Sequence, residues 1–233
     1  MLTNRIIIWI SLVVLSIPAL LFAVRLLQLS GDADRLSCNT FHNAFEAYDN
    51  VSSVTQRSVL IISSTLDPRW YSTPPAMGGF ETIIRGHKQI TPNWVGQCFA
   101  RLVGHYQPRH LMILLDSGLF LRSDNRLRED LRFIVNERKR YSLDMTISII
   151  GALKTPANLD KATSIDAGNQ AIEAWVNSQR DVRFVAPNAK FTGLYRQPKP
   201  SLFWPDGQTL SDLGNDVMAS ILTQEIEAIS LEP

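Results

Sequence analysis

Short, continuous apolar segments alternate with longer amphipathic segments from residue 58 onward. The apolar segments span 58–62, 81–84, 110–115, 145–150 and 182–185. The spacing of apolar residues predicts helices over 92–104, 124–141, 160–179 and 211–229. Continuous apolar strands are typical of parallel sheets that are buried on both faces. The pattern therefore predicts an α/β fold of three layers, in which helices flank a five-stranded parallel sheet in a flavodoxin-like arrangement.

This fold class also predicts where a binding site lies. Ligands of doubly wound sheets bind beyond the carboxyl ends of the strands, near the point where the strand order reverses. We therefore expect functional residues directly after the first three apolar segments and in the turn before the last helix.

An apolar segment near the N-terminus predicts a membrane anchor. Residues 6–24 are interrupted only by two serines and one proline, and about 20 apolar residues cross a bilayer. The segment exceeds the usual apolar region of a cleaved signal peptide. We predict a signal anchor within 1–29, a connector over 30–56 and one domain over 57–233, with a cleaved signal peptide as the alternative. The short N-terminal tail favours an extracytoplasmic domain, periplasmic or at the cell surface.

The predicted connector contains one of the two cysteines. Phe41, Phe45 and Tyr48 have the spacing of a short amphipathic helix. Outside the cytoplasm, Cys38 and Cys98 can form a disulfide that ties this segment to the first crossover helix. Two free, buried thiols are the alternative that the sequence leaves open.

Charge and ligand spacing exclude several functions. The 23 basic and 22 acidic residues give a net charge of +1, unlike the basic surface of a nucleic-acid-binding protein. The four histidines have no metal-ligand spacing, and no Gly-rich phosphate loop precedes a helix. We expect no metal, no cofactor and no nucleic-acid partner.

Four blocks in the predicted site loops resemble the SGNH (GDSL-type) hydrolase superfamily of esterases and lipases, over about residues 57–228. Ser63-Ser64-Thr65 stands where the family has Gly-Asp/Ser-Ser. The nucleophile position therefore falls on Thr65, or on Ser64 if the alignment shifts by one residue. Arg85-Gly86 and residues 106–109, Tyr-Gln-Pro-Arg, match parts of the second and third blocks. Asp206 occupies the position of the acid in the fourth block.

Other groups that the family uses are replaced in this chain. The residues at the two oxyanion-hole positions are Lys88 or Gln89 in the second block, and Ser117 or Gly118 in the third. Thr209 stands at the position of the catalytic histidine. It also begins a Thr-x-x-Asp capping box that we expect to open the last helix.

His87, in the second block, is the candidate for a substitute base; the alternative is an exposed loop histidine. A hydroxyl without an adjacent general base is a weak nucleophile. The resemblance therefore implies a domain that has lost hydrolysis and binds a glycan, a lipid or a protein partner at the membrane. Two alternatives stay open: an active esterase or acyl transferase that uses Thr65 or Ser64, and a structural subunit of a membrane complex.

Overall fold

The computed structural model describes residues 37–49, 58–72, 74–75, 77–120, 126–141 and 143–230. The predicted membrane anchor lies outside these residues. Within them, none of the helices has the length and apolar character needed to cross a bilayer. The compact unit that contains the sheet begins at Cys38.

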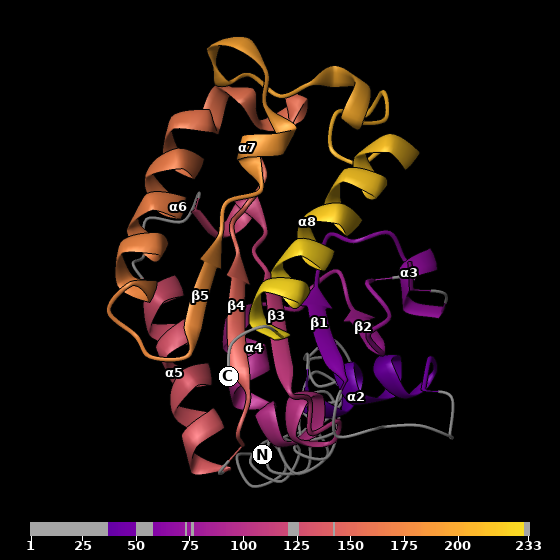
Figure 1. The fold of residues 1–233 in the computed structure, drawn as a ribbon, viewed down its shortest axis with the longest axis vertical. Helices are drawn as coiled ribbons and strands as arrows, with labels where there is room; N and C mark the ends of the chain where they lie inside the picture. The colour runs from indigo at the N-terminus through magenta and orange to yellow at the C-terminus, as the bar shows by residue number, and fades with distance from the viewer. Residues whose placement is uncertain are drawn as a thin grey trace, which may run out of the picture. The chain divides into compact units, whose positions relative to one another are not determined.

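A five-stranded parallel sheet forms the centre of this unit (Figure 1). Its strands are β1 (Val59–Ser63), β2 (Thr82–Gly86), β3 (His110–Leu114), β4 (Thr146–Ile150) and β5 (Val182–Val185). They lie in the order β2-β1-β3-β4-β5, and every neighbouring pair is parallel. The predicted sheet is therefore confirmed. The strand order reverses at β1 and β3, so the loops after these strands border the predicted binding edge.

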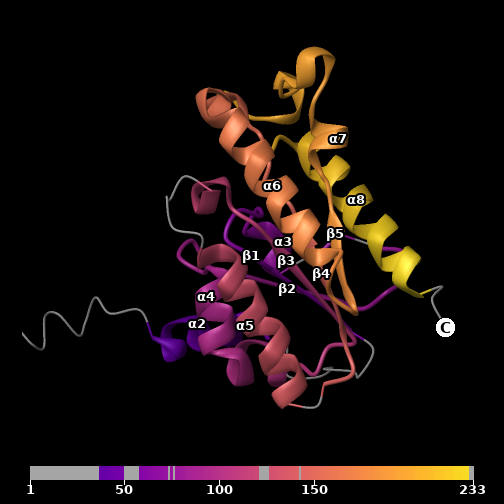
Figure 2. The same cartoon turned by 90° about the vertical axis from the view of Figure 1, so that its left-hand side faces the viewer.

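Helices cover both faces of the sheet. They are α2 (Cys38–Glu46), α3 (Arg69–Ser72), α4 (Pro92–Gln97), α5 (Arg126–Arg140), α6 (Ala162–Val176), α7 (Asn188–Phe191) and α8 (Asp212–Ser230). Figure 2 shows α4 and α5 on one side of the sheet and α8 on the other. The long helices predicted over 124–141, 160–179 and 211–229 correspond to α5, α6 and α8.

The helix predicted over 92–104 is divided in the structure. α4 ends at Gln97, and a π-helical turn follows over Ala100–Gly104. Between them, the backbone of Cys98 leaves α-helical geometry, with φ of −104° and ψ of 20°. The prediction of one continuous helix was wrong because apolar spacing does not register this change in the backbone.

A large apolar cluster joins the sheet to α8. Every residue of β1 and β3 is buried, which explains why these strands are continuously apolar in the sequence. The side chains of this cluster that come from β1, β3, β4 and α8 are Val59, Ile61, Met112, Leu114, Ile150, Met218, Ile221, Leu222 and Ile226. The loops after β1 and before α8 add Leu66 and Leu210 to the same cluster, which anchors both loops.

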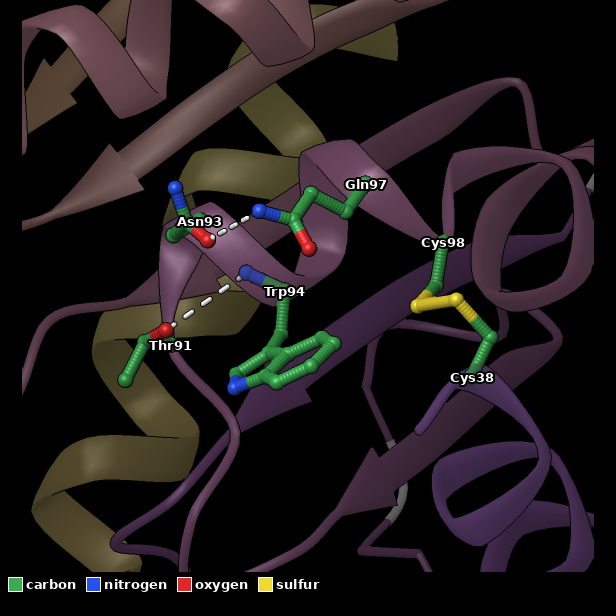
Figure 3. The surroundings of a disulfide bond; sticks show 6 residues. All are labelled: Cys38, Thr91, Asn93, Trp94, Gln97 and Cys98. Atoms are coloured by element: carbon green, nitrogen blue, oxygen red, sulfur yellow. Dashed lines mark hydrogen bonds between the residues drawn. A yellow bond between two sulfur atoms is a disulfide. The ribbon is translucent and has the colours of Figure 1, made fainter. Parts of the chain in front are cut away.

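The segment predicted as a connector contributes α2 to the same compact unit. Phe41 and Phe45 are fully buried, whereas Tyr48 follows the helix and is partly exposed. A disulfide joins Cys38 of α2 to Cys98 at the end of α4 (Figure 3). Of the two alternatives that the sequence left open for the cysteines, the structure shows the disulfide.

A largely buried ion pair holds the turn after α2 against β2. Arg85 donates to the carboxylate of Asp49 and to the backbone oxygens of Tyr48 and Tyr71. The Tyr106 hydroxyl also donates to Asp49, at 3.0 Å. Burial raises the pKa of Tyr106 above its usual range, so the hydroxyl remains a donor to the carboxylate. Arg85 and Tyr106, which belong to the matched second and third blocks, therefore have a structural use in this chain.

Candidate functional site

The loop after β1 carries the two candidate nucleophiles. The buried Ser63 hydroxyl accepts hydrogen bonds from the backbone N–H groups of Thr65 (3.0 Å) and Leu66 (3.1 Å). Ser63 thus stabilises a tight turn, a local use typical of serine at the end of a strand. Ser64 is half-buried in this turn and Thr65 is exposed. The Thr65 hydroxyl lies 3.3 Å from that of Ser63.

Gly86 makes room for the side chain that supports this turn. A Cβ atom at Gly86 would lie 2.0 Å from the Tyr71 hydroxyl oxygen. The same hydroxyl donates to the Leu66 carbonyl at 3.3 Å, and burial raises the pKa of Tyr71 to about 12. Tyr71 is therefore a neutral donor that connects β2 to the loop carrying Thr65.

The candidate acid is engaged within its own turn. One carboxylate oxygen of Asp206 accepts from the N–H groups of Gln208 (2.8 Å) and Thr209 (2.9 Å). The other accepts from the Thr209 hydroxyl at 2.5 Å. These hydrogen bonds, that of the Thr209 hydroxyl above all, lower the pKa of Asp206. Thr209 stands at the position where the family has a histidine, and its hydroxyl forms the hydrogen bond to the carboxylate of Asp206.

The predicted role of Thr209 in capping the last helix was wrong. α8 begins at Asp212, and the hydroxyl of Ser211 accepts from the Gly214 N–H at 3.1 Å. Ser211 is thus the N-cap residue. Thr209 is unavailable for this role because its hydroxyl is bonded to Asp206.

The structure links the segment after β1 to the start of α8, the helix that follows the Asp206 turn. The Arg69 guanidinium contacts Asp67 in the first loop at 2.6 Å and Asp212 at the start of α8 at 3.3 Å. Leu66 and Leu210 are members of one apolar cluster. Because the ion pairs are largely exposed, the cluster contributes more to this arrangement than the charges do.

His87, the candidate substitute base, is bound to other groups. Its Nδ1 accepts from the Gln89 N–H at 3.2 Å, and its ring packs edge-on against Phe41, with 5.2 Å between ring centroids. The other histidines contact different partners: His42 lies 3.9 Å from Glu46, His105 packs on Tyr106, and buried His110 pairs with Thr146. The described residues include all four histidines, and none is hydrogen-bonded to Ser64 or Thr65.

The candidate oxyanion positions differ between the two loops. Lys88 and Gln89 form an exposed turn after β2. After β3, the Gly118 N–H donates to the carboxylate of Asp116 at 2.6 Å. The backbone donor of Gly118 is therefore used within its own loop.

Asn158 is a site residue that the sequence analysis missed. Its side-chain amide donates to the Ser117 hydroxyl at 3.1 Å, and its carbonyl accepts from the Thr155 N–H at 2.7 Å. Asn158 is buried, and it connects the loop after β4 to the loop after β3. Thr155-Pro156 is a helix-start signal, but it does not predict a contact with Ser117, which is 41 positions away.

Comparison with known proteins identifies the fold. No protein-family model and no curated protein matches the sequence. A solved structure of an inferred acylhydrolase from Bacteroides fragilis is similar, with a TM-score of 0.67 and 16% identity over 84% of this chain and 99% of that one. A GDSL-like lipase from Bacteroides thetaiotaomicron has a TM-score of 0.65 and 17% identity over 83% and 98%.

A catalytic mutant of an acetylxylan esterase from Geobacillus stearothermophilus has a TM-score of 0.58 and 14% identity, over 73% of this chain and 94% of that one. Identities this low support the fold and leave the activity open. The resemblance inferred from the site loops is confirmed at this level: the chain has the fold of the SGNH (GDSL-type) hydrolases.

Proposed function

We propose that this protein is a membrane-anchored, extracytoplasmic SGNH-type domain that binds a glycan without hydrolysing it. The observation that carries the proposal is the turn in which the Thr209 hydroxyl occupies the carboxylate of Asp206. In an acyl-transfer site, this carboxylate would orient a histidine that takes the proton from the nucleophile. Neither Ser64 nor Thr65 has such a base among its described partners.

The expected loss of activity is large. A positioned general base contributes about 10²- to 10⁴-fold to a rate, and one oxyanion donor about 10²- to 10³-fold. At the third-block position, the Gly118 N–H is bonded to Asp116. A bound ester would therefore meet neither an activated hydroxyl nor this donor.

Two observations support the location and the ligand class. Disulfides persist in oxidising compartments and are rare in the cytosol, and the structure has a disulfide between Cys38, in the segment predicted as a connector, and Cys98. The similarity to an acetylxylan esterase favours a carbohydrate among the three partner classes that the sequence left open. A lipid or a protein partner is an alternative outcome of the binding test.

The catalytic part is tested with the full chain in a mild detergent. We expect no turnover of 4-nitrophenyl acetate or acetylated xylo-oligosaccharides beyond that of Thr65→Ala and Ser64→Ala. The double substitution Thr65→Ser and Thr209→His, which restores a base beside Asp206, should produce weak turnover. Wild-type turnover that either alanine substitution abolishes would establish an active esterase instead.

The binding and anchoring parts have separate tests. Calorimetry with neutral oligosaccharides should detect binding to the wild-type protein. Preference for lipid vesicles, with no response to saccharides, would overturn the glycan proposal. Alkaline carbonate should leave the full chain in the membrane pellet, whereas removal of residues 6–27 should release it. Release of the intact chain would contradict the anchor.

A further inference from the structure

A polar cavity of about 540 Å³ lies beyond the carboxyl ends of β4 and β5 and is lined by residues of α6 and α7. None of the site residues predicted from the sequence lines it. Its volume falls within the range of small-molecule sites, about 300–1,000 Å³. The lining side chains that matter here are Lys154, Asp166, Gln170, Glu173, Phe184 and Arg196.

An incompletely satisfied ammonium group lies in this cavity. Only 2% of the Lys154 residue is exposed, and its Nζ donates to Asp166 Oδ2 at 2.9 Å. An ammonium has three donors, and among the described residues Asp166 is its one hydrogen-bond acceptor. Buried charged groups require partners, so the cavity favours a ligand that supplies further acceptors beside Lys154.

The same carboxylate also faces a second cation. Arg196 lies 3.8 Å from Asp166 Oδ2, and Asp166 Oδ1 has no hydrogen bond within the described part of the chain. The carboxylate can therefore accept from a ligand while it neutralises Lys154. In the lining, the negative charges of two acidic residues balance the positive charges of two basic residues: Asp166 and Glu173 against Lys154 and Arg196. This balance favours a neutral ligand with many hydroxyls over a phosphate or a carboxylate.

Two asparagines hold the loop that carries Lys154. The Asn169 amide accepts from the Ala152 N–H and donates to the Ala152 carbonyl, both at 2.9 Å. The Asn188 amide accepts from the Lys154 N–H and donates to the same carbonyl, again at 2.9 Å. The loop is therefore positioned before any ligand arrives, as a binding site requires.

We propose that this cavity binds one neutral saccharide unit of the glycan. Asp166 accepts hydrogen bonds from ligand hydroxyls, Lys154 donates to a hydroxyl oxygen, and the apolar face of the sugar packs against Phe184. The inference rests on the proposed glycan binding and places it away from the crevice that carries Thr65 and Asp206.

The test uses calorimetry of the full chain with xylo-, cello- and chito-oligosaccharides. Asp166→Asn should raise the Kd about 10- to 100-fold, as expected when a hydrogen bond to a charged group is lost. Asp160→Asn is the matched control, because Asp160 is exposed just before α6 and outside the cavity. Gln170→Ala, at an exposed position of the lining, should also weaken binding without removing the buried ion pair. Thermal melting checks that each variant is folded.

Substitutions in the crevice separate this proposal from the proposed function. Thr65→Ala and Asp206→Asn should leave the Kd unchanged. If they abolish binding while Asp166→Asn and Gln170→Ala do not, the cavity proposal is overturned and glycan binding stands. An equal loss in Asp160→Asn would assign the effect to general charge and would also overturn the cavity proposal. If the wild-type protein binds none of these saccharides, both proposals are wrong.

Discussion

The disulfide between α2 and α4 should contribute a large share of the stability of this domain. Cys38 and Cys98 are 60 positions apart, so the bond removes the conformational freedom of a long loop from the unfolded chain. The loop-entropy relation gives about 4 kcal/mol for this length. The whole free energy of unfolding of a typical domain is about 5–15 kcal/mol, and 4 kcal/mol corresponds to about 10 °C in Tm at this size.

The assay is urea unfolding of the wild-type protein with and without a thiol reductant, beside the double variant Cys38→Ala and Cys98→Ala. Reduction should lower the free energy of unfolding of the wild type by about 4 kcal/mol. The double variant should match the reduced wild type and should not respond to reductant. Thiol titration of the unfolded, unreduced wild type should find no free thiol.

A decrease of less than about 1 kcal/mol on reduction would refute the loop-entropy argument. It would indicate that the buried contacts of Phe41 and Phe45 and the Arg85–Asp49 pair already restrict this segment. Two titratable thiols would contradict the disulfide itself, and with it one support for an extracytoplasmic location.

Three further predictions concern stability. Burial lowers the pKa of His110 from 6.5 to about 4, so between these pH values the unfolded chain binds a proton that the folded chain excludes. The free energy of unfolding should therefore fall by about 3 kcal/mol as the pH falls from 6.5 to 4. His110→Gln should remove this part of the pH dependence in urea titrations. Gly86→Ala should lower the free energy of unfolding by about 1–3 kcal/mol, because the new Cβ collides with Tyr71. The decrease should be smaller when Tyr71 is also replaced by leucine. A decrease near zero would show that the Tyr71 ring can move aside. Ser211→Ala should cost about 1 kcal/mol in thermal unfolding because α8 loses its N-cap, whereas an unchanged Tm would mean that Ser211 does not cap the helix.

The sequence was sufficient to predict the sheet, because a strand that is buried on both faces is a continuous apolar segment. The apolar segments over 58–62, 110–115 and 145–150 correspond to β1, β3 and β4. The helix predicted over 92–104 is divided in the structure, because the spacing of its apolar residues does not indicate the change of backbone geometry at Cys98.

The contacts of the site were less predictable because more than one residue in the sequence could make the same contact. Thr209 and Ser211 both carry a hydroxyl suited to a helix N-terminus, and the sequence alone does not rank them. The fold does, because Asp206 engages Thr209 and leaves Ser211 to cap α8. The role of Asn158 depends on Ser117 in another loop, so no local pattern reveals it.

The sequence by itself determined the number of strands, their positions along the chain and their parallel character, and the resemblance located the loops after β1 and before α8. Only the tertiary structure decided which residues of separate segments meet: it joins Asn158 to Ser117 and places Lys154 beside Asp166 in a cavity. The physical reason is that strand formation depends on the burial of neighbouring residues, whereas a hydrogen bond between separate segments depends on two groups that chain folding brings together.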